Sequence, residues 1–266
     1  MRIGTKFLAS LIIALLMSVQ LHATKLDNDI DAVISLGEQI SSIRSMLGDY
    51  IIIGTKIKFK NPSERLKASI EKYDATLELL NKKYSSDAYI QKILKESQVT
   101  WKPIKDKLLQ ATTIDKETMR KEAQFVHDNI RNIIISMEKI QEHLLKNISS
   151  VNSIELKSAI DISTASHLLS AHYMMKMWKL SDPTIITHWD RGIATYQKSI
   201  DTLKKSSHYK NVEFKGWLDE TESIVEYLIM SFSMIETNAS PSIVFNKCET
   251  VYEVSNKMVQ KIVTTK

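Results

Sequence analysis

The sequence is poor in glycine, proline and cysteine, and each shortage excludes a class of structure. Six glycines and four prolines in 266 residues leave few positions for tight turns, so a sheet of many short strands is not expected. The single cysteine, Cys248, has no partner for a disulfide within the chain, and we expect it to be buried on a helix.

The motifs of common enzymes and metal sites are also missing. There is no glycine-rich phosphate loop, no His-Glu-x-x-His and no Gly-x-Ser-x-Gly, so the sequence predicts a protein that is not an enzyme. His172 precedes Met174 and Met177, a combination that suits copper(I), but both methionines already belong to an apolar helix face. His127 and His143 lie 16 residues apart on one predicted helix and cannot share an ion. We therefore expect no metal and no cofactor.

The N-terminal segment has the pattern of a secretory signal peptide. Arg2 and Lys6 precede an uncharged apolar run, Phe7–Val19, and Leu21–Ala23 ends in a small residue suited to cleavage. The run of 13 residues is short of the roughly 20 that a spanning helix needs. We expect residues 1–23 to be a cleaved signal peptide and the remaining chain to be periplasmic or secreted. An uncleaved N-terminal anchor is the alternative.

Basic residues exceed acidic ones only slightly. The formal net charge is +5 for the whole chain and +3 once Arg2 and Lys6 are removed, and the charges are spread along the sequence. Nucleic-acid binding requires a concentrated basic surface, so we expect no nucleic acid as partner.

The spacing of apolar residues predicts an all-α fold. Apolar residues recur at alternating intervals of three and four, as on helices that pack nearly parallel in a bundle. The clearest stripes are Val33, Leu36, Ile40, Ile43, Leu47 and Tyr50; Met119, Ala123, Val126, Ile130, Ile133, Met137, Ile140 and Leu144; and Val244, Cys248, Val251, Ser255, Met258 and Ile262. Eight helices are predicted, at residues 26–58, 62–83, 87–110, 114–148, 153–181, 183–206, 212–236 and 241–264.

The prolines mark predicted helix ends. Asn61-Pro62, Asp182-Pro183 and Ser240-Pro241 each place a residue that favours the N-cap before a proline at the first helical position. Pro103 is expected to kink or to start a helix.

The two halves of the sequence resemble each other at an offset of about 122 residues. Gln39–Ser42 matches Asp161–Thr164, Tyr73 matches Tyr196, and the proline-marked helix starts follow in the same order. The repeat predicts two tandem four-helix up-down bundles after the signal peptide, at residues 24–149 and 150–266.

The first helix of each half carries a motif. Ile160–Ser170 reads Ile-Asp-Ile-Ser-Thr-Ala-Ser-His-Leu-Leu-Ser, and Glu38–Gly48 follows the same frame more loosely. Thr100–Pro103 contains Trp-x-Pro, and Ser255–Val259 carries an asparagine on the last helix. These segments resemble the helices of the PilJ-type domain of type IV pilus chemotaxis transducers and NarX-like nitrate and nitrite sensor kinases. The resemblance implies two degenerate copies of a four-helix sensory domain.

The resemblance also indicates candidate ligand-binding residues. The family's anion-binding arginine falls on Ser45 in the first half and on His167 in the second. Arg44 lies one position away, about 100° around the helix. A second register places Ile40 at that position instead.

Polar residues cluster on the same helices. Ser163, His167 and Ser170 follow one another on an otherwise apolar face, where a protonated His167 could donate two hydrogen bonds to an anion. The alternative is a hydrogen-bonded histidine at a helix interface. The matching face of the first half carries Gln39, Ser42, Ser45 and Asp49, and an anion there would need Arg44.

Two functions follow from these features. The first is a periplasmic sensory protein in signal transduction that binds nitrate, nitrite or another small solute between facing first helices, without a transmembrane signalling part of its own. A homodimer through the first helices is one arrangement that would bring such helices together. The alternative is a helical interaction module that binds no ligand and docks on a membrane-bound receptor, transducer or pilus component, because neither half has the family's arginine.

Overall fold

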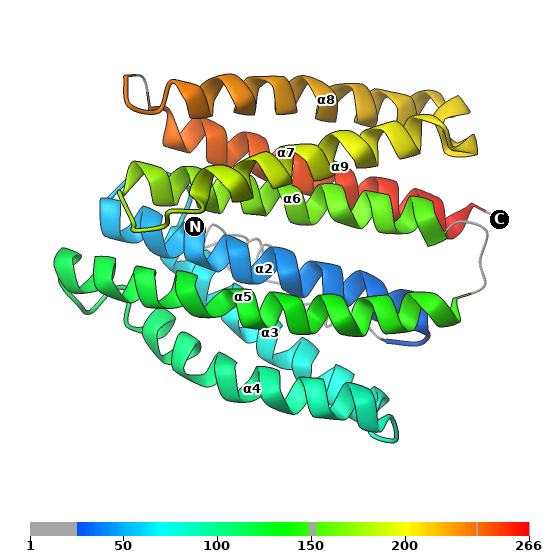
Figure 1. Ribbon diagram of the computed structural model, residues 1–266, viewed down its shortest axis with the longest axis horizontal. Helices are drawn as coiled ribbons and strands as arrows, with labels where there is room; N and C mark the ends of the chain where they lie inside the picture. The colour runs from blue at the N-terminus through cyan, green and yellow to red at the C-terminus, as the bar shows by residue number, and fades with distance from the viewer. Residues whose placement is uncertain (1–25, 149–152, 238, 266) are drawn as a thin grey trace, which may run out of the picture.

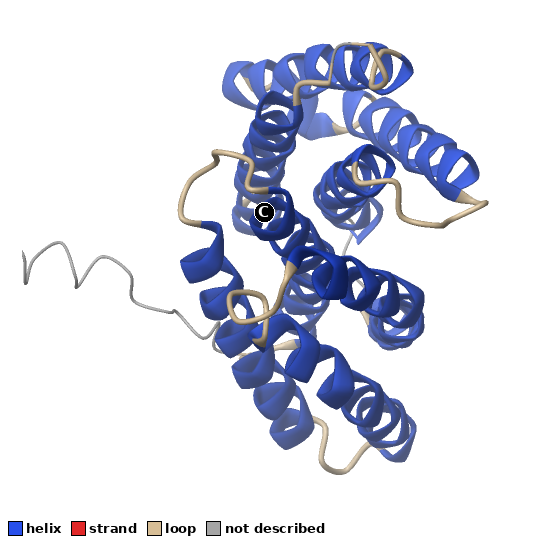
Figure 2. Cartoon of the chain, turned by 90° about the vertical axis from the view of Figure 1, so that its left-hand side faces the viewer, coloured by secondary structure: helices blue, strands red, loops and turns tan. Residues whose placement is uncertain are grey.

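The computed structural model describes residues 26–148, 153–237 and 239–265, and these residues form eight α-helices, one short 3₁₀-helix and no strand. Figure 2 shows helices joined by loops alone. The helices are α2 (Asp29–Thr55), α3 (Pro62–Lys83), α4 (Ala88–Leu109), α5 (Lys116–Asn147), α6 (Ser153–Met177), α7 (Ile185–Lys204), the 3₁₀-helix η1 (Ser207–Lys210), α8 (Val212–Ser233) and α9 (Pro241–Thr264). The predicted all-α fold is confirmed, and each predicted helix agrees to within four residues at either end.

Two other expectations concern the membrane. The predicted signal peptide, residues 1–23, lies outside the described residues. Within the described ranges, none of the helices combines the length and the apolar character that crossing a membrane would require.

The helices of each half contact one another in a ring (Figure 1). In the first half α2 packs on α3, α3 on α4, α4 on α5, and α5 returns to α2. In the second half α6, α7, α8 and α9 do the same. The halves meet where α2 packs against α6, so these two helices lie at the centre of the molecule.

The sequences of α2 and α6 explain their central position. Of the 27 residues of α2, 19 are buried, as are 17 of the 25 residues of α6, against only 10 of 32 in α5. Large apolar residues, alanine, glycine and serine occupy most of the surface of both helices. A helix without a polar face is stable only when other helices surround it. The predicted stripes on α2, α5 and α9 are buried in full, and Cys248 is buried as expected.

Small residues allow α2 and α6 to approach closely. A methyl group added at Gly37 would overlap the side chain of Ile160, which would have to shift to make room for it. The hydroxyl oxygens of Ser41 and Ser163 lie 3.3 Å apart. These serines are 122 residues apart, which is the offset of the predicted repeat, so α2 and α6 meet through matching positions.

The ends of α2 and α6 also match. Lys56 and Lys179, 123 residues apart, both adopt the left-handed conformation with φ of 56°. After each lysine the chain folds back in the same way, because Ile57 N donates to Ile52 O and Leu180 N donates to Met175 O. Both ends have the pattern of hydrogen bonds that closes a helix with a left-handed residue.

The proline expectations are only partly correct. Pro62 and Pro241 open α3 and α9 as predicted, but the side chains of the residues before them form no capping hydrogen bond. Pro103 lies inside α4. Helix α7 begins at Ile185, two residues after Pro183, and Asp182 is therefore free to face the interior between the halves.

Substitution of two glycines tests the contact between α2 and α6. Gly37→Ala should lower the free energy of unfolding by roughly 1–2 kcal/mol, because overpacking against Ile160 outweighs the better helix propensity of alanine. Gly216→Ala on α8 is the matched control, since no atom lies within 4 Å of the added methyl group. It should raise the free energy of unfolding by about 0.5–1 kcal/mol. Urea denaturation measures the free energy of unfolding of both variants. An equal increase in Gly37→Ala and Gly216→Ala would contradict the close contact of α2 with α6.

Candidate functional site

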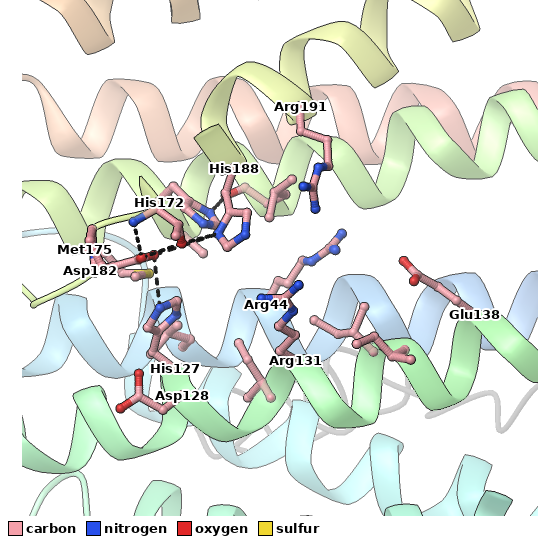
Figure 3. Close-up of a pocket in the computed structure, with 18 residues that line it drawn as sticks. Arg44, His127, Asp128, Arg131, Glu138, His172, Met175, Asp182, His188 and Arg191 are labelled. Atoms are coloured by element: carbon pink, nitrogen blue, oxygen red, sulfur yellow. Dashed lines mark hydrogen bonds and ion pairs between the residues drawn. The ribbon is translucent and has the colours of Figure 1, made fainter. Parts of the chain in front are cut away.

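A cavity of about 540 Å³ lies between the two halves, where α5 and α7 flank the contact of α2 with α6 (Figure 3). Its lining includes apolar side chains, among them Leu47, Ile134 and Leu168. Charged and titratable side chains gather toward two ends. Figure 3 shows His127, His172, His188 and Asp182 at one end, and Arg44, Arg131, Arg191 and Glu138 toward the other.

Arg44 extends from α2 toward α6 at the arginine end. Its Nη1 donates to the carbonyl oxygen of Thr164 at 2.8 Å, while its buried Nε has no hydrogen-bond partner among the described residues. Burial lowers the pKa of Arg44 to about 10, although the nearby carboxylates of Glu138 and Asp161 act in the opposite direction. Arg44 therefore stays charged at neutral pH and keeps one unused donor.

Arg131 on α5 and Arg191 on α7 stand on either side of the opening. Both are exposed, and neither makes a hydrogen bond or an ion pair with another residue in the described ranges. Together with Arg44 they place three guanidinium groups around one cavity. Guanidinium groups bind carboxylates and other oxyanions through paired hydrogen bonds, so this end is suited to an anion.

The histidine end is built around the carboxylate of Asp182. His127 Nε2 lies 3.2 Å and His188 Nδ1 3.8 Å from Asp182 Oδ2. Burial alone would raise the pKa of Asp182, but hydrogen bonds from Thr184 and the neighbouring imidazoles hold it below its ordinary value. Asp182 is therefore ionised.

His172 is the most enclosed member of this group. Burial lowers its pKa to about 4, with His127, Arg44 and His188 contributing, so the ring is neutral. Burial also lowers the pKa of His188, despite the opposing effect of Asp182. One ligand atom each from His172, Asp182 and His188 lies within 4.8 Å of the other two, so these residues could hold a metal ion.

Of the residues predicted from the sequence, only Arg44 lines this cavity. Ser42 on α2 is partly buried. The other predicted residues are buried in the packing of the central helices, and they are Gln39, Ser45, Ser163, His167 and Ser170. Ser163 contacts Ser41, as described above, and Ser170 Oγ has no hydrogen-bond partner within the described chain.

His167 belongs to a second polar group, on the side where α3 and α9 flank the central helices. Its Nε2 lies 3.2 Å from Glu249 Oε1. Arg65 contacts both Glu249, at 3.0 Å, and Asp49, at 3.4 Å. An anion at His167 would have to compete with the Glu249 carboxylate, so this position is less suited to an anion than Arg44.

The pKa values of Glu249 and Asp49 are shifted in opposite directions. Burial would raise the pKa of Glu249, but the hydrogen bond and charge of His167 and the charge of Arg65 hold it at about 2. Burial raises the pKa of Asp49 to about 7, although Arg65 lowers it in part. Glu249 is thus ionised and Asp49 titrates close to neutral pH.

The two polar groups occupy matching positions of the predicted repeat. Three pairs are separated by 123 residues: Arg44 and His167, Asp49 and His172, and Arg65 and His188. A fourth pair, His127 and Glu249, is separated by 122. The same four positions therefore form an ion-pair network on one side of the molecule and the cavity on the other.

The histidine end was missed in the sequence because its members come from separate segments. The sequence pattern sets His172 beside Met174 and Met177 and His127 beside His143, and neither pairing points to Asp182 or His188; His143 lies elsewhere, beside Asp87. The available signal was the run of His172, Asp182 and His188 within 17 residues, across a predicted helix end and a helix start.

The pKa of Asp49 predicts how stability responds to pH. Its pKa is higher in the folded than in the unfolded chain, so its favourable contribution is complete below about pH 4 and is lost as pH rises through about 7. Asn at this position cannot ionise. The free energy of unfolding of Asp49→Asn, relative to that of the original protein, should therefore rise by roughly 2–4 kcal/mol between pH 4 and pH 8. Urea denaturation at the two pH values measures this. The exposed carboxylate variant Glu117→Gln is the control, and an equal effect of Asp49→Asn at both pH values would contradict the prediction.

Protein family models, curated protein sequences and solved structures contain no match to this chain.

Proposed function

We propose that this protein is a ligand-binding protein of the periplasm or cell exterior, built from two PilJ-like four-helix units, and that it binds a small organic anion in the cavity between the halves. The signal-like N-terminus supports the location, and the repeat and matching helix ends support the two units. The ligand-bound protein would then signal by contact with a membrane-bound receptor or transducer.

The observation that carries the proposal is the position of Arg44. This guanidinium is charged, enclosed beside the α2–α6 contact, and has a buried Nε without a partner among the described residues. A buried donor left unpaired is costly, and an oxyanion would satisfy it with a charge-assisted hydrogen bond. Arg131 and Arg191 at the opening would attract the same ligand and add contacts to it.

The lining of the cavity favours an organic anion over a bare inorganic one. About 540 Å³ is within the range of pockets that enclose a small organic molecule. Leu47, Ile134 and Leu168 provide an apolar surface beside the arginines. A small carboxylate with an apolar part would use both, whereas nitrate would use only the arginines.

The position of the cavity beside the two first helices supports the proposal. The cavity lies next to the contact of α2 with α6 within one chain, where α5 and α7 flank it. The tandem arrangement would thus bring two first helices together within a single chain, as a homodimer would bring them together from two chains.

Ligand screening of the purified protein tests this proposal. A panel of small carboxylates, with nitrate and nitrite included, should contain a compound that raises the melting temperature and binds in calorimetry. Arg44→Met keeps much of the side-chain volume without the charge. It should weaken that binding by about 10- to 100-fold, because a charge-assisted hydrogen bond contributes roughly 1.5–3 kcal/mol.

Arg120→Met is the matched control. Arg120 lies on α5, as Arg131 does, but outside the cavity, where it donates to the carbonyl oxygen of Lys179. Binding should survive this substitution. A panel without any binder, or a binder whose affinity is the same in Arg44→Met, would contradict the proposal. Co-purification with a membrane receptor in the absence of any ligand would favour the interaction-module alternative.

A further inference from the structure

The histidine end of the cavity has side chains from four separate segments directed at one point (Figure 3). His127 comes from α5, His172 from α6, Asp182 from the segment between α6 and α7, and His188 from α7. The His172 ring lies edge-on to the other two imidazoles, with centroids 6.3 Å from His127 and 5.5 Å from His188. Ring packing and ion pairs hold the group together in the described structure.

His172 is oriented like a histidine that binds a metal ion. Its Nδ1 lies 2.8 Å from the carbonyl oxygen of Leu168 and, as the protonated nitrogen of a neutral ring, donates to it. The Nε2 lone pair is then free, and that atom is buried without a hydrogen-bond partner among the described residues. A backbone carbonyl that fixes the far nitrogen is the usual outer support of a metal-binding imidazole.

Asp182 is oriented in a similar way. Its Oδ1 accepts hydrogen bonds from the backbone N and the hydroxyl of Thr184, at 2.7 and 2.6 Å. Its Oδ2 is buried, accepts no hydrogen bond, and faces the imidazoles of His127 and His188. One oxygen thus fixes the carboxylate, and the other is available to a cation.

We propose that one divalent transition-metal ion, such as Zn²⁺, binds to His172, Asp182 and His188, with His127 as a fourth ligand. Imidazole nitrogens with one carboxylate oxygen are a common ligand set for Zn²⁺, and they also suit Co²⁺ and Ni²⁺. This site needs neither the arginine end nor the binding of an anion. It departs from the expectation that the chain binds no metal.

The required movement is small. In a tetrahedral site with bonds of about 2.0–2.1 Å, neighbouring ligand atoms are about 3.3 Å apart. The ligand atoms of His172, Asp182 and His188 lie within 4.8 Å of one another, so they need to approach by up to about 1.5 Å. His127 does not belong to this group of three, although its Nε2 lies 3.2 Å from Asp182 Oδ2. Asp182 lies outside the helices, and rotation of its side chain and that of His188 provides such an adjustment.

The other side of the α2–α6 pair, where α3 and α9 lie, shows a different set of side chains at the matching positions. There Asp49 replaces His172, Arg65 replaces His188 and Glu249 replaces His127 at the matching positions. Arg65 contacts both carboxylates. On that side the Arg65 guanidinium provides the positive charge between the carboxylates, and in the cavity a metal ion would do so.

Titration of the protein, purified without an affinity tag and stripped with a chelator, tests the site. Calorimetry should show one Zn²⁺ bound per chain, and Zn²⁺ should raise the melting temperature. Co²⁺ should give visible absorption of the intensity that a tetrahedral centre produces, and Zn²⁺ should remove it. His172→Ala and Asp182→Asn should each weaken binding by at least about 100-fold, more than the loss of an outer support usually causes.

His188→Arg is the sharpest variant, because Arg65 occupies the matching position in the ion-pair network on the other side of the central helices. This variant should keep its fold, pair with Asp182 and lose Zn²⁺ binding, so it remains informative if His172→Ala does not fold. His143→Ala is the control, since His143 lies on α5 away from the group and should not affect binding. Absence of stoichiometric Zn²⁺ and Co²⁺ binding, or unchanged binding in both His172→Ala and His188→Arg, would overturn the proposal.

Discussion

The packing of α2 against α6 is the contact on which the rest of this structure depends. Both helices lack an outward polar face, so neither half could bury its first helix alone. Gly37 and the facing serines allow the two backbones to approach closely. The outer helices then arrange themselves around this pair, with α5 and α7 on one side and α3 and α9 on the other.

Each side of this central pair carries a polar group, and the difference between them suggests a division of roles. Where α3 and α9 lie, Arg65 pairs with two carboxylates and His167 faces one of them, so the charges are mutually compensated. Where α5 and α7 lie, Arg44 Nε, His172 Nε2 and Asp182 Oδ2 remain without hydrogen-bond partners in the described chain. His167 Nδ1 and Asp49 Oδ1 on the α3 and α9 side are likewise without hydrogen-bond partners in the described chain, so the two sides differ in the pairing of their charges and in the cavity that Arg44, His172 and Asp182 line. The two proposed ligands, an anion at the arginines and a metal ion at the histidines, would share one cavity.

Much of the fold could be predicted from the sequence, because apolar periodicity records which face of each helix is buried. The stripes beginning at Val33, Met119 and Val244 are buried as predicted, and the helix limits follow from them. Periodicity does not record which helices face each other. The site was therefore predicted only in part: Arg44 is among the predicted residues and lines the cavity, whereas His167, for which an anion ligand and a hydrogen-bonded interface histidine are the two predictions, lies against Glu249. The histidine group requires α5, α6 and α7 to be brought together, and no local pattern in the sequence contains that information.

The contact of α2 with α6 can be measured directly by cross-linking its closest matched pair. Ser41→Cys and Ser163→Cys, combined in one chain, place two thiols where hydroxyl oxygens lie 3.3 Å apart, close enough for a disulfide after a small adjustment. After mild oxidation and denaturation, the account predicts a monomer with a single free thiol, that of Cys248, which is buried in the native protein. Three free thiols per chain, or disulfides formed only between chains, would show that the first helices do not face each other and would contradict the account.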